Sequence, residues 1–93
     1  MTFALVTTQH FERRATKFLR KHPDLKAVFK ETLGQLRQDP FQSSLRLHGL
    51  TGALAGVQEA VSLTHAYRLT LILKVTEREI VLLDIGAHDE VYR

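Results

Sequence analysis

The sequence predicts an α+β fold in which a small antiparallel sheet packs on an N-terminal helical hairpin. Two amphipathic helical patterns lie between Thr8 and Asp39, and three β-rich segments lie between Val57 and Ile85. A short β-rich segment precedes the helices, so the expected element order is β-α-α-β-β-β. A length of 93 residues suits one hydrophobic core, and we expect a single domain over residues 1–93.

The N-terminal segment predicts a strand followed by a helix. The strand covers Phe3 to Val6 or Thr7, and Thr7 or Thr8 can cap the helix. His22-Pro23 is expected to end the helix near Lys21, because the residue before a proline avoids the α conformation. Apolar residues at i, i+4, i+7 and i+8 give this helix one inner stripe: Phe11, Ala15, Phe18 and Leu19.

A second helix is expected from Pro23-Asp24 to Asp39-Pro40, antiparallel to the first. Gly34 inside it costs about 1 kcal/mol relative to alanine, so we expect a close contact between helix and sheet at that point. Phe11, Phe18 and Phe29 lie at helical spacing and are interpreted as core residues. The inner face of the second helix would carry Leu25, Val28, Phe29, Leu33 and Leu36.

Residues 40–56 are predicted to form a loop, and strand patterns resume at Val57. The alternation from Val57 to Thr64 predicts one strand, and the segments Tyr67–Val75 and Glu79–Ile85 predict two longer ones. Residues 76–78 would be the turn between the last two. Strands joined by short turns imply an antiparallel meander, with both helices on one face. The opposite face would be open and would form the working surface.

Composition excludes several classes of protein. The absence of cysteine excludes a disulfide framework, a thiolate metal site and a cysteine nucleophile. The N-terminus lacks the pattern of a signal peptide, and no apolar run approaches the roughly 20 residues of a membrane span. We therefore expect a cytoplasmic protein that does not use a membrane.

Positive charge is concentrated in the helical region. The net charge is only +3, but seven basic residues lie between residues 13 and 30. Such a surface could bind RNA, DNA or an acidic partner, or could simply be a solvated helix face. The seven are Arg13, Arg14, Lys17, Arg20, Lys21, Lys26 and Lys30.

No metal site or cofactor is expected. His10 and His22 lie at the ends of the first predicted helix and are interpreted as structural. The remaining candidate ligands lack the short spacing between histidines that typical zinc sites show. They are His48, His65, His88 and Asp89.

Four short motifs resemble the RelE/ParE superfamily of type II toxins from toxin–antitoxin systems. The first, Leu45-Arg46-Leu47-His48-Gly49-Leu50-Thr51-Gly52, is similar to an element of the YafQ-like branch. The others are the strand from Ala60 to Leu63, the triplet Tyr67-Arg68-Leu69, and the C-terminal run Gly86-Ala87-His88-Asp89-Glu90-Val91-Tyr92. The resemblance covers essentially the whole chain and implies a RelE-like fold.

The resemblance also implies an activity, a site and partners. RelE-type toxins are mRNA interferases, which cleave translated mRNA at the ribosome without metal and are neutralised by a cognate antitoxin. Arg68 would stabilise charge on the phosphate, His88 would be the general acid or base with His48 as its counterpart, and Tyr92 would stack on a base or orient the phosphate. Binding of ribosomal RNA and mRNA would fall to Arg13, Lys17, Arg20, Lys21 and His65.

Simpler interpretations stand beside each of these roles. Arg68 could form a cross-strand ion pair with Asp84 or Glu79, His88 could cap a turn, Tyr92 could anchor the C-terminus, and His48 could be an ordinary loop residue. Many active members carry basic residues on the second strand of the β-α-α-β-β-β order, where this chain has residues 59–62, Glu-Ala-Val-Ser. The alternative function is therefore a non-catalytic binding protein, either a ParE-like gyrase inhibitor or a decayed toxin.

Overall fold

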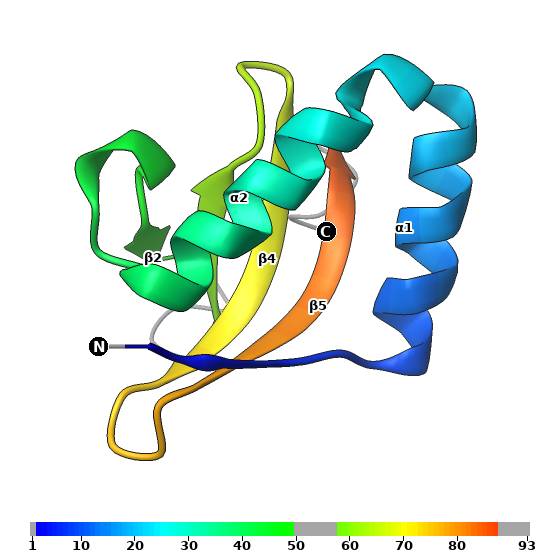
Figure 1. Ribbon diagram of the computed structural model, residues 1–93. Coiled ribbons are helices and arrows are strands. Elements are labelled where there is room, and N and C mark those ends of the chain that lie inside the picture. Colours follow the sequence, from blue (N-terminus) through cyan, green and yellow to red (C-terminus); the bar gives the residue numbers. More distant parts are fainter. Residues whose placement is uncertain (1, 50–57, 88–93) are drawn as a thin grey trace.

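The computed structural model describes residues 2–49 and 58–87 and confirms the predicted α+β class (Figure 1). Two α-helices and two 3₁₀ turns accompany five strands. In chain order the elements are β1 (Ala4–Val6), α1 (Gln9–Lys21), η1 (Pro23–Leu25), α2 (Lys26–Gln38), η2 (Ser43–Leu45), β2 (His48–Gly49), β3 (Glu59–Ser62), β4 (Tyr67–Lys74) and β5 (Glu79–Ala87).

The strands form one mixed sheet in the order β1-β5-β4-β3-β2. The predicted antiparallel meander is present, since β4 pairs antiparallel with both β3 and β5. The N-terminal strand β1 instead lies parallel to β5, and the two pair only along Glu79–Val81 of β5. Among the described strands, none pairs with the outer side of β5 beyond Val81, and α1 lies along this part of β5 in Figure 1.

The segment predicted as a loop over residues 40–56 contains structure in its described part. The turn η2 ends at Leu45, and the C-cap residue that follows, Arg46, has a left-handed backbone with φ 53°. His48 and Gly49 then pair antiparallel with Ala60 and Glu59 at the edge of the sheet. A strand of two residues is too short to show alternation, so the residue pattern did not predict it. Residues 50–57, including Gly52 and Gly56, lie outside the described residues.

Thr8, one of the two predicted cap residues, is the N-cap of α1 and also connects the helix to the sheet. Its hydroxyl oxygen accepts a hydrogen bond from the Phe11 backbone N–H at 3.0 Å and donates one to the Leu82 carbonyl at 3.3 Å. The helix ends at Lys21, immediately before His22-Pro23, as the proline rule requires.

Changing Thr8 to alanine is therefore expected to lower the free energy of unfolding by about 1–2 kcal/mol, because both the cap and the contact with β5 are lost. Urea denaturation followed by circular dichroism would measure the change. Thr7→Ala is the matched control, since among the described residues the Thr7 hydroxyl donates a hydrogen bond to the exposed Glu12 carboxylate and to no other group. Equal effects of the two changes would contradict the assigned cap.

The core lies between the two helices and one face of the sheet. Leu36 of α2 is fully buried against the inward side chains of β3, β4 and β5, and Phe11 of α1 stacks on Phe29 of α2 with ring centroids 6.4 Å apart. Gly34 does not make the predicted close approach to the sheet: it is exposed, and a Cβ there would have no neighbour within 4 Å. The inward strand residues are Val61, Leu69, Leu71, Ile80, Leu82 and Ile85.

The face of the sheet away from the helices is only partly open. Strand alternation places Ala60, Ser62, Arg68 and Thr70 on this side, which we call the helix-free face. Ala60 and Thr70 are nevertheless buried, at 0% and 1% exposure. The prediction of a fully open working surface is therefore wrong over this central part of the sheet.

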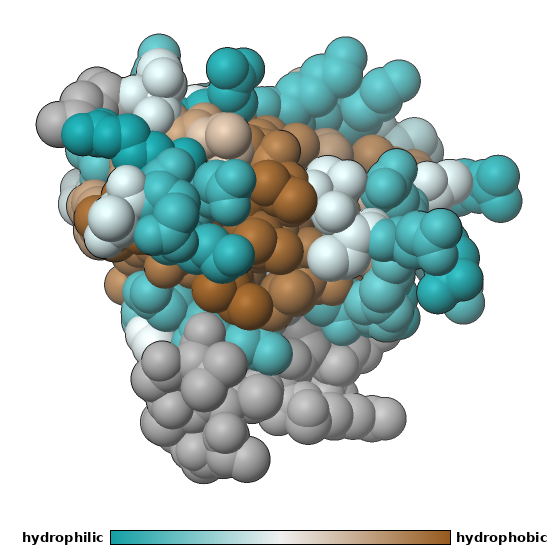
Figure 2. Space-filling view, turned by 90° about the horizontal axis from the view of Figure 1, so that it is seen from below, coloured by the Kyte–Doolittle hydropathy of each residue, from teal (hydrophilic) through white to brown (hydrophobic). Residues whose placement is uncertain are grey.

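The underside of the molecule, toward which the β4–β5 turn points, exposes apolar surface bordered by hydrophilic side chains (Figure 2). The large apolar side chains that are exposed in the described part of the chain are Val6, Phe41 and Val75. None of the described helices is long and apolar enough to cross a membrane.

Candidate nucleic-acid interface

Arg68 lies on the helix-free face at the start of β4, opposite Ser62 of β3 and Gly86 of β5. Its side chain folds back over the β3–β4 turn, where Nη1 donates to the carbonyl oxygens of Thr64 at 2.8 Å, His65 at 3.1 Å and Tyr67 at 3.2 Å. Neither of the proposed cross-strand ion pairs, with Asp84 or with Glu79, is formed.

These three bonds use only one end of the guanidinium. Arginine carries five N–H donors in a planar fork, and within residues 2–49 and 58–87 the Nε and Nη2 atoms of Arg68 make no hydrogen bond. These carbonyls therefore fix the orientation of the guanidinium, while its Nε–Nη2 edge can donate hydrogen bonds to an anion.

His65 and His48 occupy different places relative to Arg68. His65 is exposed in the β3–β4 turn, and its carbonyl is one of the three that hold Arg68. His48 is in β2, in register with Ala60 and thus with Thr70, and its Nδ1 lies 2.8 Å from the Arg46 carbonyl oxygen. Arg68 lies two strands away from His48 and two residues further along β4, so at the usual strand dimensions their Cα atoms are about 12 Å apart. The structure thus places Arg68 beside His65, and it places His48 two strands away on the same helix-free side of the sheet.

The predicted residues His88 and Tyr92 lie outside the described residues. The last described residue, Ala87, is the Cα partner of Tyr67, and Gly86 is the partner of Arg68. His88 therefore follows in sequence directly after the position that pairs with the first residue of β4.

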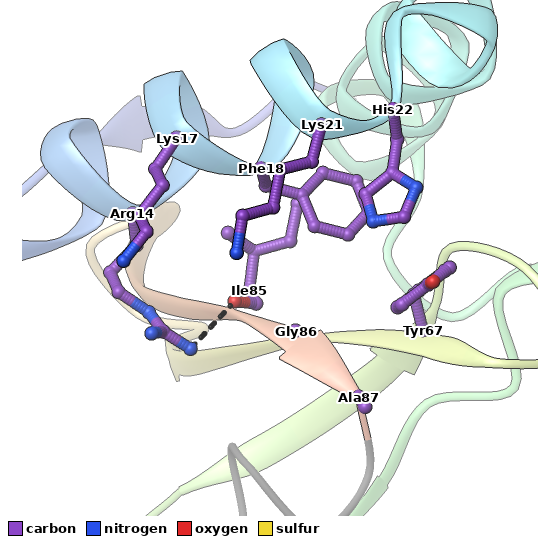
Figure 3. Close-up of a pocket in the computed structure, with 9 residues that line it drawn as sticks. All are labelled: Arg14, Lys17, Phe18, Lys21, His22, Tyr67, Ile85, Gly86 and Ala87. Atoms are coloured by element: carbon purple, nitrogen blue, oxygen red, sulfur yellow. Dashed lines mark hydrogen bonds between the residues drawn. The ribbon is translucent and has the colours of Figure 1, made fainter.

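The predicted RNA-binding residues of α1 fall into two groups. Lys17 and Lys21 line a cleft between α1 and the end of β5, which we call the α1 cleft (Figure 3). Arg13 and Arg20 lie with Glu12 in a shallow depression elsewhere on the helix, which Lys17 also borders. The residues that line the α1 cleft are Arg14, Lys17, Phe18, Lys21, His22, Tyr67, Ile85, Gly86 and Ala87.

The floor of the α1 cleft is aromatic. Tyr67 meets Phe18 edge to face, with ring centroids 4.9 Å apart and an interplanar angle of 81°. The ring of His22 lies 4.9 Å from Tyr67 and 4.7 Å from Phe18. Sequence reasoning missed His22 and Tyr67 as site residues, because only the fold brings the end of α1 to the start of β4.

Within residues 2–49 and 58–87, no group of three or more histidine, cysteine, aspartate or glutamate side chains is arranged to hold a metal ion. Of the four candidate ligands, His88 and Asp89 lie outside the described part of the chain. His48 and His65 are on β2 and in the β3–β4 turn.

Comparisons with known proteins place the fold. No protein-family model and no curated protein matches the chain. Among solved structures, YafQ from Escherichia coli is similar over 98% of this chain and 99% of its own, with a TM-score of 0.78 and 13% identity. A copper-bound mutant toxin from Helicobacter pylori is similar over 98% of this chain and 99% of its own, with a TM-score of 0.77 and 24% identity. A chain of the RelBE2 toxin–antitoxin complex from Mycobacterium tuberculosis is similar over 95% of this chain and 100% of its own, with a TM-score of 0.73 and 20% identity.

The chain has the fold of the RelE/ParE toxins. In this RelE-like fold the described site residues form two surfaces. Arg68 and His65 lie at one end of the helix-free face, and the α1 cleft lies on the helix side of the same end of the sheet, because adjacent residues Tyr67 and Arg68 point to opposite faces.

Asp84 fixes α1 to the outer edge of β5 in this RelE-like fold. Its carboxylate accepts from Arg14 Nε at 2.9 Å and from the Ile85 N–H at 2.8 Å, and its other oxygen lies 3.5 Å from His10 Nε2. Arg14 also donates from Nη2 to the Ile85 carbonyl at 3.3 Å (Figure 3). Side chains of α1 thus supply partners to the part of β5 that β1 does not cover.

Asp84→Ala is accordingly expected to lower the free energy of unfolding by about 1–3 kcal/mol, since charge-assisted hydrogen bonds are removed at a site that is mostly buried. Thermal unfolding measured by calorimetry would show the loss as a lower Tm. Glu77→Ala in the exposed β4–β5 turn is the control for removing one carboxylate. A loss no greater than the control's would show that the Arg14–Asp84 contact does not hold α1 in place.

Proposed function

We propose that this chain is a type II toxin that cleaves translated mRNA at the ribosome as a metal-independent endoribonuclease. The RelE-like fold supports the toxin class. The observation that carries the nuclease is the orientation of the Arg68 guanidinium. The carbonyls of Thr64, His65 and Tyr67 hold its Nη1, and within the described residues its Nε and Nη2 make no hydrogen bond.

The proposed reaction is attack of a ribose 2′-hydroxyl on the adjacent phosphate. The 2′-oxygen forms a bond to phosphorus while the bond to the 5′-oxygen of the next nucleotide breaks. Arg68 would stabilise the negative charge that develops on the phosphate oxygens. His88 would give a proton to the leaving 5′-oxygen or take one from the 2′-hydroxyl, His48 would supply the opposite transfer, and Tyr92 would stack on a base.

The proposed partners are the ribosome with its mRNA and a cognate antitoxin. RelBE2, which shares the fold, was solved as a toxin–antitoxin complex. For this chain an antitoxin segment that covers Arg68 and His88, or displaces the residues around Tyr92, would block the site. Such segments commonly order only on binding.

A second candidate function is a non-catalytic binding protein, of the ParE-like gyrase-inhibitor type or a decayed toxin. It is favoured by β3, which contributes Ala60 and Ser62 to the helix-free face beside Arg68. Neither side chain can neutralise phosphate charge, so Arg68 would bear that task among the described residues of β3 and of the first half of β4.

Induction of the chain alone, with growth measured and a reporter mRNA mapped by primer extension, separates the two functions. The nuclease predicts growth arrest and cleavage within the reading frame, both lost in Arg68→Ala and in His88→Ala. Retained binding of the antitoxin would show that the variants fold. Arrest without cleavage would refute the nuclease and favour another target, and no arrest would indicate a decayed toxin.

A further inference from the structure

The α1 cleft differs from the Arg68 surface in its chemistry. Three permanent cations, Arg14, Lys17 and Lys21, stand at i, i+3 and i+7 and so form one stripe along α1. No acidic side chain is among the described residues that line the cleft. Within residues 2–49 and 58–87, the only ion pair made by the stripe is that of Arg14 with Asp84, and neither lysine has an acidic partner.

The size of the α1 cleft limits its ligand. Its volume is about 240 Å³, below the roughly 300–1,000 Å³ of pockets that enclose drug-sized molecules. Lys17 and Lys21, which have no acidic partner among the described residues, lie about 6 Å apart along the helix at 1.5 Å per residue. That length matches about two nucleotides of a stacked strand at about 3.4 Å each. The cleft therefore suits part of an extended polyanion better than an enclosed metabolite.

The aromatic floor favours nucleic acid over an acidic peptide. Figure 3 shows the side chains of Lys17, Lys21 and His22 descending from α1 toward the end of β5, with Tyr67 projecting from β4 opposite them. A carboxylate-rich peptide would use the cations but has no planar group to place on Tyr67. A single-stranded nucleic acid has both phosphates for the cations and bases for the ring.

We infer that the α1 cleft is a binding site for single-stranded RNA, in which Lys17 and Lys21 bind backbone phosphates and Tyr67 with His22 receives a base. The inference rests on the proposed action on RNA, and it adds a site separate from the Arg68 surface. Because Tyr67 and Arg68 are adjacent residues on opposite faces, a strand held in the cleft lies at the same end of the sheet as the proposed reaction.

Fluorescence anisotropy with a labelled 12-nucleotide RNA tests the inference, using full-length protein that carries Arg68→Ala throughout so that no RNA is cleaved. Lys17→Gln with Lys21→Gln is expected to weaken binding roughly fiftyfold at 50 mM salt. It should also reduce the slope of log affinity against log salt by about 1.4, since each lost phosphate contact on a single strand contributes about 0.7. Lys26→Gln with Lys30→Gln, exposed on α2 and outside the cleft, is the control with the same change in charge.

Tyr67 provides the second arm of the test. Tyr67→Leu is expected to weaken RNA binding by about 5- to 150-fold, the usual effect of losing one stacked base, without changing the salt slope. Tyr67→Phe keeps the ring and should bind like the parent. Circular dichroism of both variants would identify any loss of fold, and the Tyr67→Phe comparison stands even if Tyr67→Leu unfolds.

Two results would overturn the inference. One is equal weakening by the α1 pair and the α2 pair, which would mean that net charge alone attracts RNA. The other is competition by polyglutamate as effective as that by unlabelled RNA, which would assign the cleft to an acidic peptide. If binding follows the expected pattern but the wild-type chain never cleaves mRNA in the primer-extension experiment, the proposed nuclease is refuted and the RNA site stands.

Discussion

Changing Arg68 to lysine is expected to slow mRNA cleavage by about a hundredfold or more while leaving the free energy of unfolding nearly unchanged. Removing one group that stabilises developing negative charge typically costs about 10²–10³ in rate. Lysine keeps the positive charge and can still donate to the carbonyls of Thr64 and His65, but it loses the fork that contacts two phosphate oxygens at once.

The measurement is single-turnover cleavage of an mRNA on purified programmed ribosomes, together with urea denaturation of each variant. Arg37→Lys, exposed in the last turn of α2, controls for the same exchange at a neutral site. Arg68→Ala should lose the rate and also some stability, because the turn carbonyls lose their donor. Cleavage by Arg68→Lys at the wild-type rate would show that the reaction does not need the guanidinium.

Local signals in the sequence predicted most of the elements. Thr8 caps α1, His22-Pro23 ends it, and the alternation around Val61 and Leu69 marks β3 and β4. Each signal depends on residues a few positions apart, either through one hydrogen bond at a helix end or through the two-residue period of a strand. Such short-range rules can be applied without knowledge of the tertiary structure.

Features that depend on distant residues were not predictable in the same way. The parallel pairing of β1 with β5 joins residues 4–6 to 79–81, and no turn specifies its register. The partner of Asp84 proved to be Arg14, seventy residues away, whereas hairpin geometry suggested Arg68. Arg68 instead donates hydrogen bonds to backbone carbonyls, because the β3–β4 turn lies within reach of its side chain.

The candidate site shows the same division. The basic residues of α1 were identified from sequence, but only helical periodicity combined with the position of β5 separates Lys17 and Lys21 from Arg13 and Arg20. Spacing alone could have joined Arg14 to the two lysines, since i, i+3 and i+7 share one face. Nothing local points to Tyr67, whose neighbours Phe18 and His22 come from another element.

Leu69→Ala is expected to give the largest loss of stability among these variants. Leu69 is fully buried in the central strand β4, and Leu→Ala changes at such sites cost about 2.7–5 kcal/mol through lost burial and the cavity left behind. A chain of this length has only about 5–14 kcal/mol of total stability. Calorimetry should therefore show a Tm lowered by about 10–30 °C. Val75→Ala, at 56% exposure just beyond β4, is the apolar control and should change the stability little; comparable losses from the two would contradict the assigned core.

Leu69 and Arg68 are neighbours in the chain, yet their variants should fail for different reasons. Leu69→Ala leaves the Arg68 guanidinium chemically intact, so growth arrest lost at 37 °C should return at low temperature as the folded fraction recovers. Arg68→Lys stays folded at both temperatures and should remain inactive at both. Recovery of both variants on cooling would mean that Arg68 acts through the stability of the β3–β4 turn, and the charge-stabilising role would then have to be assigned to another residue.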